Sequence, residues 1–123
     1  MLRRQLFFLT CLLCFASSAV LAQDVLKVAG GPETHKVVLD NDEVRMLDAR
    51  VQPGQKVAMH SHPPNTVYYM TDCKLKVTAP DGKTQIAESK AATAIWRGET
   101  KHAVENVGTA ECHLVQTELK EKK

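Results

Sequence analysis

Short runs in which apolar and polar residues alternate follow one another along the chain from residue 25 onward. The clearest alternation is 74–78, where Leu75 and Val77 share one face because strand side chains alternate with period two. Turn residues separate the runs, as in Pro80-Asp81-Gly82-Lys83, which is typical of a hairpin turn. The pattern predicts strands at 25–28, 36–39, 43–51, 56–62, 66–71, 74–78, 84–88, 94–97, 102–107 and 113–119.

Many short strands with close turn signals favour a small all-β barrel or sandwich. The segment 87–94, A-E-S-K-A-A-T-A, is the one place where a helix competes, since its residues have good helix propensity. It is short and has no apolar stripe, so we expect an all-β fold here too.

Residues 1–22 have the pattern of a signal peptide rather than of a folded element. Arg3 and Arg4 precede an apolar run at 6–15, and small residues lead up to Ala22. The run is short for a membrane anchor, which is the alternative. We therefore expect cleavage after Ala22 and export to the periplasm or the medium, with no membrane attachment afterwards.

Removal of this segment changes the charge of the chain. The sequence has 16 Lys and Arg against 14 Asp and Glu, and loss of Arg3 and Arg4 makes the two counts equal. No basic stripe remains, which argues against nucleic acid as a partner. The remaining residues, about 100 in number, suffice for one domain with one core.

The candidate chemistry lies at His60 and His62, just after the Pro53-Gly54 turn. On a strand these two side chains point the same way, with their Cα atoms roughly 6–7 Å apart. His102, on a second predicted strand, is a third candidate ligand, and three neutral imidazoles suit a transition metal with open coordination positions. The alternative is two surface histidines beside a turn.

These residues resemble the two motifs of the cupin superfamily, whose first motif reads G-x5-H-x-H and whose second ends in H-x3-N. Gly54, His60 and His62 match the first, and His102 with Asn106 matches the second. The resemblance covers roughly residues 43–118. It implies a single-domain jelly-roll barrel at 43–119, preceded by an N-terminal strand segment at 23–42. It also implies a metal site of His60, His62 and His102, with Asn106 holding a turn or acting in the second shell.

The sequence departs from the family's first motif at two positions, and the usual P-x-G-x-x-H before His102 is not met. The family's glutamate ligand falls on Thr66, and its closing glycine falls on Cys73. Three histidines without the carboxylate still suit Fe, Mn, Zn, Ni or Cu in the divalent state, so the identity of the metal stays open. Thr66→Glu is expected to restore a fourth ligand.

Two side chains on the strand after His62 are weak candidates for catalysis. Thr66 and Tyr68 are in phase, and we expect both to point toward the barrel interior, with Tyr69 on the opposite face. Thr66 could hydrogen-bond a metal-bound water and Tyr68 could act as an acid, although strand formation and core packing are the alternatives. Trp96 is a further candidate for the pocket mouth. The three histidines also invite comparison with the cupin thiol dioxygenases.

The exported part of the chain keeps two cysteines, Cys73 and Cys112. Export permits a disulfide. If the jelly-roll interpretation holds, however, the two residues begin neighbouring antiparallel strands and lie at opposite ends. That separation is too large for a bridge, so we expect two free thiols.

The first histidine strand also bears on assembly. If His60 and His62 face the interior, Val57 and Met59 face outward and need a cover. A second copy of the chain is the simplest cover and predicts a homodimer. The alternative is that the segment 25–39 folds over that face.

Two functions from different classes remain. One is a metal-dependent enzyme, of oxygenase type, that acts on a small organic substrate through open coordination positions. The other is a non-catalytic module that binds a metal or small ligand. A metal-free structural protein is a third interpretation, which the retention of all three histidines disfavours.

Overall fold

The computed structural model describes residues 22–122, so residues 1–21 of the expected signal peptide lie outside the described residues. Within 22–122, no helix has the length and apolar character needed to cross a membrane. Two single helical turns, η1 (Val25–Lys27) and α1 (Gly31–Thr34), precede nine strands. The strands are β1 (His35–Asp40), β2 (Val44–Val51), β3 (Lys56–His62), β4 (Asn65–Tyr69), β5 (Cys73–Thr78), β6 (Thr84–Ser89), β7 (Thr93–Arg97), β8 (Thr100–Asn106) and β9 (Cys112–Leu119).

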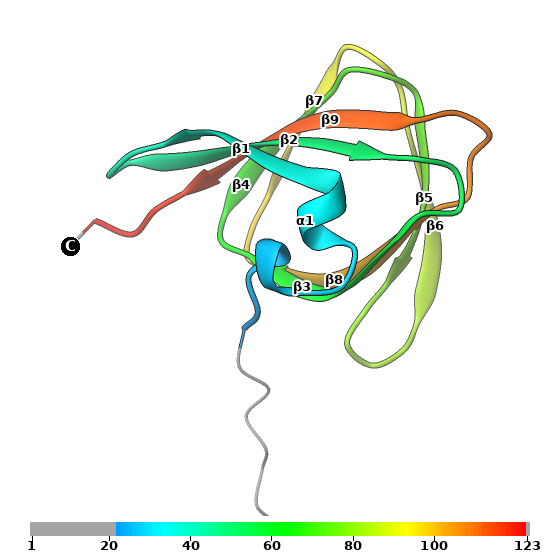
Figure 1. The fold of residues 1–123 in the computed structure, drawn as a ribbon, viewed down its shortest axis with the longest axis horizontal. Helices are drawn as coiled ribbons and strands as arrows, with labels where there is room; N and C mark the ends of the chain where they lie inside the picture. The colour runs from blue at the N-terminus through cyan, green and yellow to red at the C-terminus, as the bar shows by residue number, and fades with distance from the viewer. Residues whose placement is uncertain (1–21, 123) are drawn as a thin grey trace, which may run out of the picture.

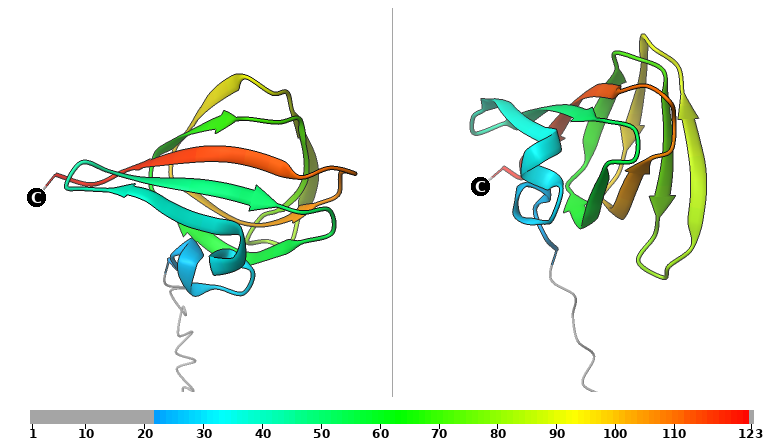
Figure 2. Two further views of the ribbon diagram at one scale, coloured as in Figure 1. Left: turned by 45° about the horizontal axis from the view of Figure 1, so that its top comes forward. Right: turned by 45° about the vertical axis from the view of Figure 1, so that its right-hand side comes forward.

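The strands form two antiparallel sheets that face each other as a jelly-roll barrel (Figures 1 and 2). One sheet has the order β1-β2-β9-β4-β7 and the other the order β3-β8-β5-β6. The predicted all-β fold is confirmed, and the segment 87–94 contributes to β6 and β7 rather than to a helix. The predicted turn at Pro80–Lys83 joins β5 to β6, with Gly82 at φ +85°.

A disulfide joins Cys73 to Cys112, so the prediction of two free thiols is wrong. The two residues begin β5 and β9, which belong to different sheets and are not neighbours in one. The starts of these strands meet at the same end of the barrel, with the Cα atoms 4.8 Å apart. Both sulfurs lie in the main core cluster with Ala49, Val51, Val67, Tyr69, Leu75 and Leu114. The error came from treating the two strands as paired partners.

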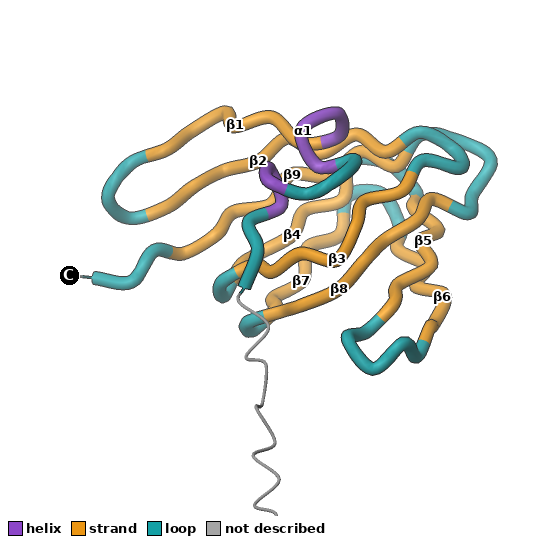
Figure 3. The backbone as a smooth tube through the Cα atoms, turned by 60° about the horizontal axis from the view of Figure 1, so that its bottom comes forward, coloured by secondary structure: helices purple, strands orange, loops and turns teal. Residues whose placement is uncertain are grey.

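The N-terminal segment, expected as a strand, holds η1 and α1 before β1 pairs with β2 (Figure 3). It runs along β3: the Ala58 amide donates to the Ala29 carbonyl at 2.9 Å. The backbones approach so closely that a Cβ on Gly30 would lie 1.9 Å from the Lys56 carbonyl oxygen. Gly30 also has φ +80°, so both its conformation and its neighbour require glycine.

Val57 does not face outward as predicted. It is buried in a second core cluster with Val25 and Leu47. A β-bulge between Val57 and His60 reverses the phase of the strand, so that Val57 pairs with Val104 and His60 with His102 on the same face. Met59 is half-buried. The homodimer was predicted because Val57 and Met59 were expected to need a cover on the outer face. Val57 needs none, and the homodimer stays a prediction.

Candidate metal centre

Three histidines meet inside the barrel, as the sequence predicted. His60 and His62 come from β3 and His102 from β8, and His60 pairs directly with His102 in the ladder. One ligand atom from each ring lies within 4.8 Å of the others. All three side chains are buried, with His60 only 1 % exposed. The arrangement is therefore an enclosed set of nitrogen donors.

The His60 ring is oriented by the backbone of its own strand. Its Nδ1 lies 2.7 Å from the Ala58 carbonyl oxygen. Because a carbonyl only accepts, Nδ1 carries the proton and donates it. This bond leaves the Nε2 lone pair of His60 available to a metal ion.

The His62 ring is oriented by a carboxylate. Its Nδ1 donates to Glu118 Oε1 at 2.7 Å, and the Arg45 Nε donates to Glu118 Oε2 at 2.6 Å. Arg45 in turn donates through Nη1 to Asp24 Oδ2 at 2.6 Å. Imidazole, carboxylate and guanidinium thus form one chain of charge-assisted hydrogen bonds from η1 to the histidines.

Glu118 is ionised in this chain although it is 2 % exposed. Burial would raise its pKa, but the hydrogen bonds from His62 and Arg45 outweigh burial and lower the pKa below 4.5. An ionised carboxylate that accepts the His62 Nδ1 proton raises the basicity of the opposite nitrogen. Glu118 therefore supports a metal ligand without being one.

Two of the three histidines, together with His35 nearby, are held neutral. Burial lowers the pKa of His60 to about 4 and that of His102 to about 3. His35 lies on β1 with its ring centroid 6.3 Å from that of His60, and burial lowers its pKa to about 4. Neutral imidazoles are the form that binds metal ions.

Thr66 and Tyr68 do not point into the site, so this part of the prediction is wrong. Asn65, Val67 and Tyr69 are buried, whereas Thr66 and Tyr68 are exposed. Pro63 and Pro64 turn the chain between β3 and β4, so the inward phase begins at Asn65 rather than at Thr66. Trp96, which pairs with Thr66, is 60 % exposed and shares its outward face.

Asn106 holds turns at the disulfide end of the barrel. Its Nδ2 donates to the carbonyls of Val51 at 2.7 Å and Ala110 at 2.9 Å, and its Oδ1 accepts from the Gly108 amide at 2.9 Å. These bonds support the turn-holding role that was predicted as one of its two alternatives. The rings of His60 and His62 are oriented by Ala58 and Glu118 instead.

Sequence reasoning missed Glu118, Arg45 and His35. Glu118 left a signal: it is in phase with Leu114 and Gln116, so a charge stands on the inward face of the last strand. Arg45 pairs with Glu118 in the ladder, and this became visible only once the strand register was known. His35 left no such signal, because it follows a helical turn and no alternating strand residues precede it to indicate its face.

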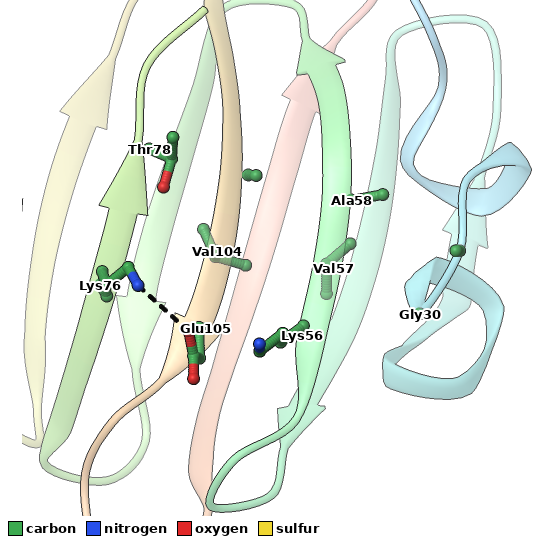
Figure 4. Close-up of a pocket in the computed structure, with 10 residues that line it drawn as sticks. Gly30, Lys56, Val57, Ala58, Lys76, Thr78, Val104 and Glu105 are labelled. Carbon is green, nitrogen blue, oxygen red and sulfur yellow. Dashed lines mark ion pairs between the residues drawn. The ribbon is translucent and has the colours of Figure 1, made fainter. Parts of the chain in front are cut away.

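Two of the hollows within residues 22–122 are lined by residues of β3 and β8, the strands that carry the histidines. One, of about 370 Å³, lies on the outer face of β3, β8 and β5 and contains the Lys76–Glu105 ion pair (Figure 4). None of the three histidines lines it. The other, of about 300 Å³, is lined by Ala22, Ser61, His62, Glu99, Thr100 and Lys101, and it reaches the metal centre at His62.

The donor set fits one transition-metal ion. Three imidazoles, two of them with oriented Nδ1 protons, suit a borderline ion such as Fe²⁺, Zn²⁺, Ni²⁺ or Cu²⁺. Glu118 is engaged by His62 and Arg45, so the histidines form the whole ligand set that the geometry offers within residues 22–122. Three ligands leave coordination positions for a small molecule.

Comparisons with known proteins agree with this architecture. A family model described as a cupin domain matches residues 47–117. A cupin-domain structure from Bordetella pertussis Tohama I is similar with TM-score 0.66 and 27 % identity, covering 71 % of this chain and 92 % of that chain. A Bacillus halodurans structure has TM-score 0.57 and 16 % identity, over 73 % and 72 % of the two chains.

The polyketide cyclase RemF from Streptomyces resistomycificus is also similar in fold, with TM-score 0.52 and 22 % identity over 71 % of this chain and 64 % of RemF. No curated protein matches the sequence. The family match spans more than half of the chain and includes all three histidines. The chain therefore belongs to the cupin domain family.

Proposed function

We propose that this cupin is an exported metal-dependent enzyme of oxygenase type that acts on a small organic substrate. The observation that carries the proposal is the enclosed set of His60, His62 and His102, with ligand atoms within 4.8 Å of one another. A bound divalent metal would supply Lewis acidity and open positions for dioxygen and substrate. The chain's own contribution is to orient the rings and to exclude water from them.

The disulfide supports the proposed export. Disulfides persist in oxidising compartments and are rare in the reducing cytosol. Cys73 and Cys112 are bonded and buried in the core, as expected of a structural disulfide in an exported protein. The apolar run at 6–15 supports the same destination.

A second function, a non-catalytic binding module, is favoured by one observation. Glu118 is the carboxylate that contacts the histidines, and hydrogen bonds to His62 and Arg45 occupy both of its oxygens. It is therefore not free to act as a general base. A site that binds a small ligand without turning it over would need no such base.

The deciding experiment is elemental analysis of the protein purified from its native compartment, followed by oxygen-consumption assays with small thiols, enediols and phenols. The proposal expects about one divalent metal per chain and substrate-dependent oxygen uptake. His62→Ala should remove most of the metal, whereas His113→Ala should not, because His113 is bonded to Asp48 away from the centre. Metal without turnover would favour the binding module, and unchanged metal content in His62→Ala would refute the site.

A further inference from the structure

Arg97 occupies the end of β7 and belongs to the inward face of its sheet. It pairs with Asn65 in the ladder, and paired residues of neighbouring strands share a face. Asn65 is fully buried, and its other ladder partner is Glu118, the residue that orients His62. Arg97 is half-buried. The register therefore places the Arg97 side chain on the same inner surface as Glu118.

The Arg97 guanidinium is held within the barrel by a tyrosine. Its Nη2 donates to the Tyr69 hydroxyl at 3.1 Å, and Tyr69 is 2 % exposed. Tyr69 lies four residues along β4 from Asn65, so the Arg97 side chain extends along the interior rather than out to solvent. One hydrogen bond engages one of the five N–H donors of a guanidinium.

Arg97 has no carboxylate partner among residues 22–122. The other two arginines of this part of the chain do have partners: Arg45 pairs with Asp24 and Glu118, and Arg50 pairs with Asp48 and Glu111. A half-buried guanidinium without a counter-ion is costly, because burial penalises a charge that nothing compensates. An anion supplied by a ligand would compensate it.

Arg97 adds a positive charge to the inner surface of the barrel on the sheet that faces the metal centre. Three neutral imidazoles leave the two positive charges of a divalent metal uncompensated, and Arg97 adds a third. Arg45 is shared between Asp24 and Glu118, so this group carries one net negative charge, which offsets only one of the three positive charges. The inner surface therefore favours an anionic ligand.

We propose that Arg97 is the ligand-binding residue that selects small organic carboxylates, with its guanidinium on the carboxylate and the rest of the molecule directed to the metal held by the three histidines. This assignment rests on the proposed metal centre and names its substrate class. A planar guanidinium fork matches the two oxygens of a carboxylate. Tyr69 is the positioning residue that keeps the fork inside the barrel.

Lactate and lactamide form a matched pair of probes, because they differ in charge and hardly in shape. Each is titrated into the Co²⁺-loaded full exported protein while the visible absorption of Co²⁺ is followed. The wild-type protein should bind lactate at least about tenfold more tightly than lactamide, as a charge-assisted hydrogen bond implies. Arg97→Met should abolish this preference, and Arg97→Lys should keep part of it.

Arg50→Met is the control, since it removes the same charge from an exposed arginine on the outer face. It should leave the lactate preference unchanged. Tyr69→Phe should weaken the preference without changing the Co²⁺ content, which a purely structural role of Arg97 would not produce. If Arg97→Met fails to fold, Arg97→Lys and Tyr69→Phe carry the test.

The metal content of each variant separates the two proposals. An equal preference for lactate in the wild type and in folded, Co²⁺-loaded Arg97→Met would overturn the assignment of Arg97 and leave the metal centre standing. A wild-type protein that takes up no Co²⁺ would overturn the proposed function and this assignment with it. Loss of Co²⁺ together with the preference in Arg97→Lys would also overturn the assignment, because Arg97 would then support the metal site.

Discussion

Glu118 Oε1 accepts a hydrogen bond from His62 Nδ1 at 2.7 Å in the interior of the barrel, although 56 positions separate the two residues in the sequence. Strand β9 brings Glu118 to the histidines from the opposite sheet. The bond fixes which nitrogen of His62 faces the other two rings. Glu118, which the family motif does not include, thus supports the site by orienting a metal ligand.

Glu118→Gln should weaken metal binding without removing it. The amide keeps the shape but loses the charge that raises the basicity of His62, and it leaves Arg45 with one carboxylate partner. Loss of the carboxylate that accepts the Nδ1 proton of a metal-binding histidine lowers metal affinity about 10–100-fold. Competition with a chelator measures the change. Glu88→Gln, at an exposed ion pair with Lys74, is the control and should have no effect.

The sequence predicted the fold and the three histidines because both depend on local patterns. Strand alternation and the H-x-H spacing are properties of a few consecutive residues. The wrong face was predicted for some residues where an irregularity interrupts the alternation. The β-bulge before His60 turns Val57 inward, and the turn at Pro63-Pro64 turns Thr66 and Tyr68 outward. Neither the bulge nor the turn changes the composition of its strand, so the alternation alone did not reveal them.

Contacts between distant strands could not be predicted in the same way. The Cys73–Cys112 disulfide and the chain from Asp24 through Arg45 to Glu118 depend on which strands oppose each other across the barrel. The spacing of residues in the sequence does not show which strands face each other across the barrel. The family resemblance placed the ligands but not these supports.

Thr66→Glu should leave metal affinity unchanged. The family pattern suggested that a glutamate here would complete the ligand set, but Thr66 lies on the outward face of β4 next to Trp96. A carboxylate at this position would meet solvent rather than the metal. Chelator competition with Mn²⁺ and Fe²⁺ tests this, and tighter binding than in the wild type would show that position 66 reaches the histidines.

The disulfide should contribute measurably to stability. Cys73 and Cys112 are 39 positions apart, and closing a loop of that size stabilises a protein by about 2–4 kcal/mol. A thiol count after denaturation without reductant should give no free thiol from this pair. The double substitution Cys73→Ala and Cys112→Ala should lower the free energy of unfolding in urea by an amount in that range. Two reactive thiols per chain would contradict the bonded state.

The metal-free protein should lose stability as the pH falls from about 6.5 toward 4. The pKa values of His35 and His60 are lowered to about 4 and that of His102 to about 3, chiefly by burial, from 6.5 in the unfolded chain. The unfolded state therefore takes up protons first, so the stability of the folded state is complete above pH 6.5 and declines below it. Urea unfolding in the presence of a chelator, repeated at several pH values, measures the slope.

His102→Gln should flatten this slope, because the variant lacks one of the buried imidazoles that resist protonation. The lowered pKa of Glu118 shifts stability only below its ordinary value of 4.5, so it does not account for a loss that begins near pH 6.5. A slope that is the same in His102→Gln and in the wild type would show that His102 is not held neutral in the barrel. A wild-type protein whose stability is constant from pH 7 to 5 would contradict the burial of His35, His60 and His102.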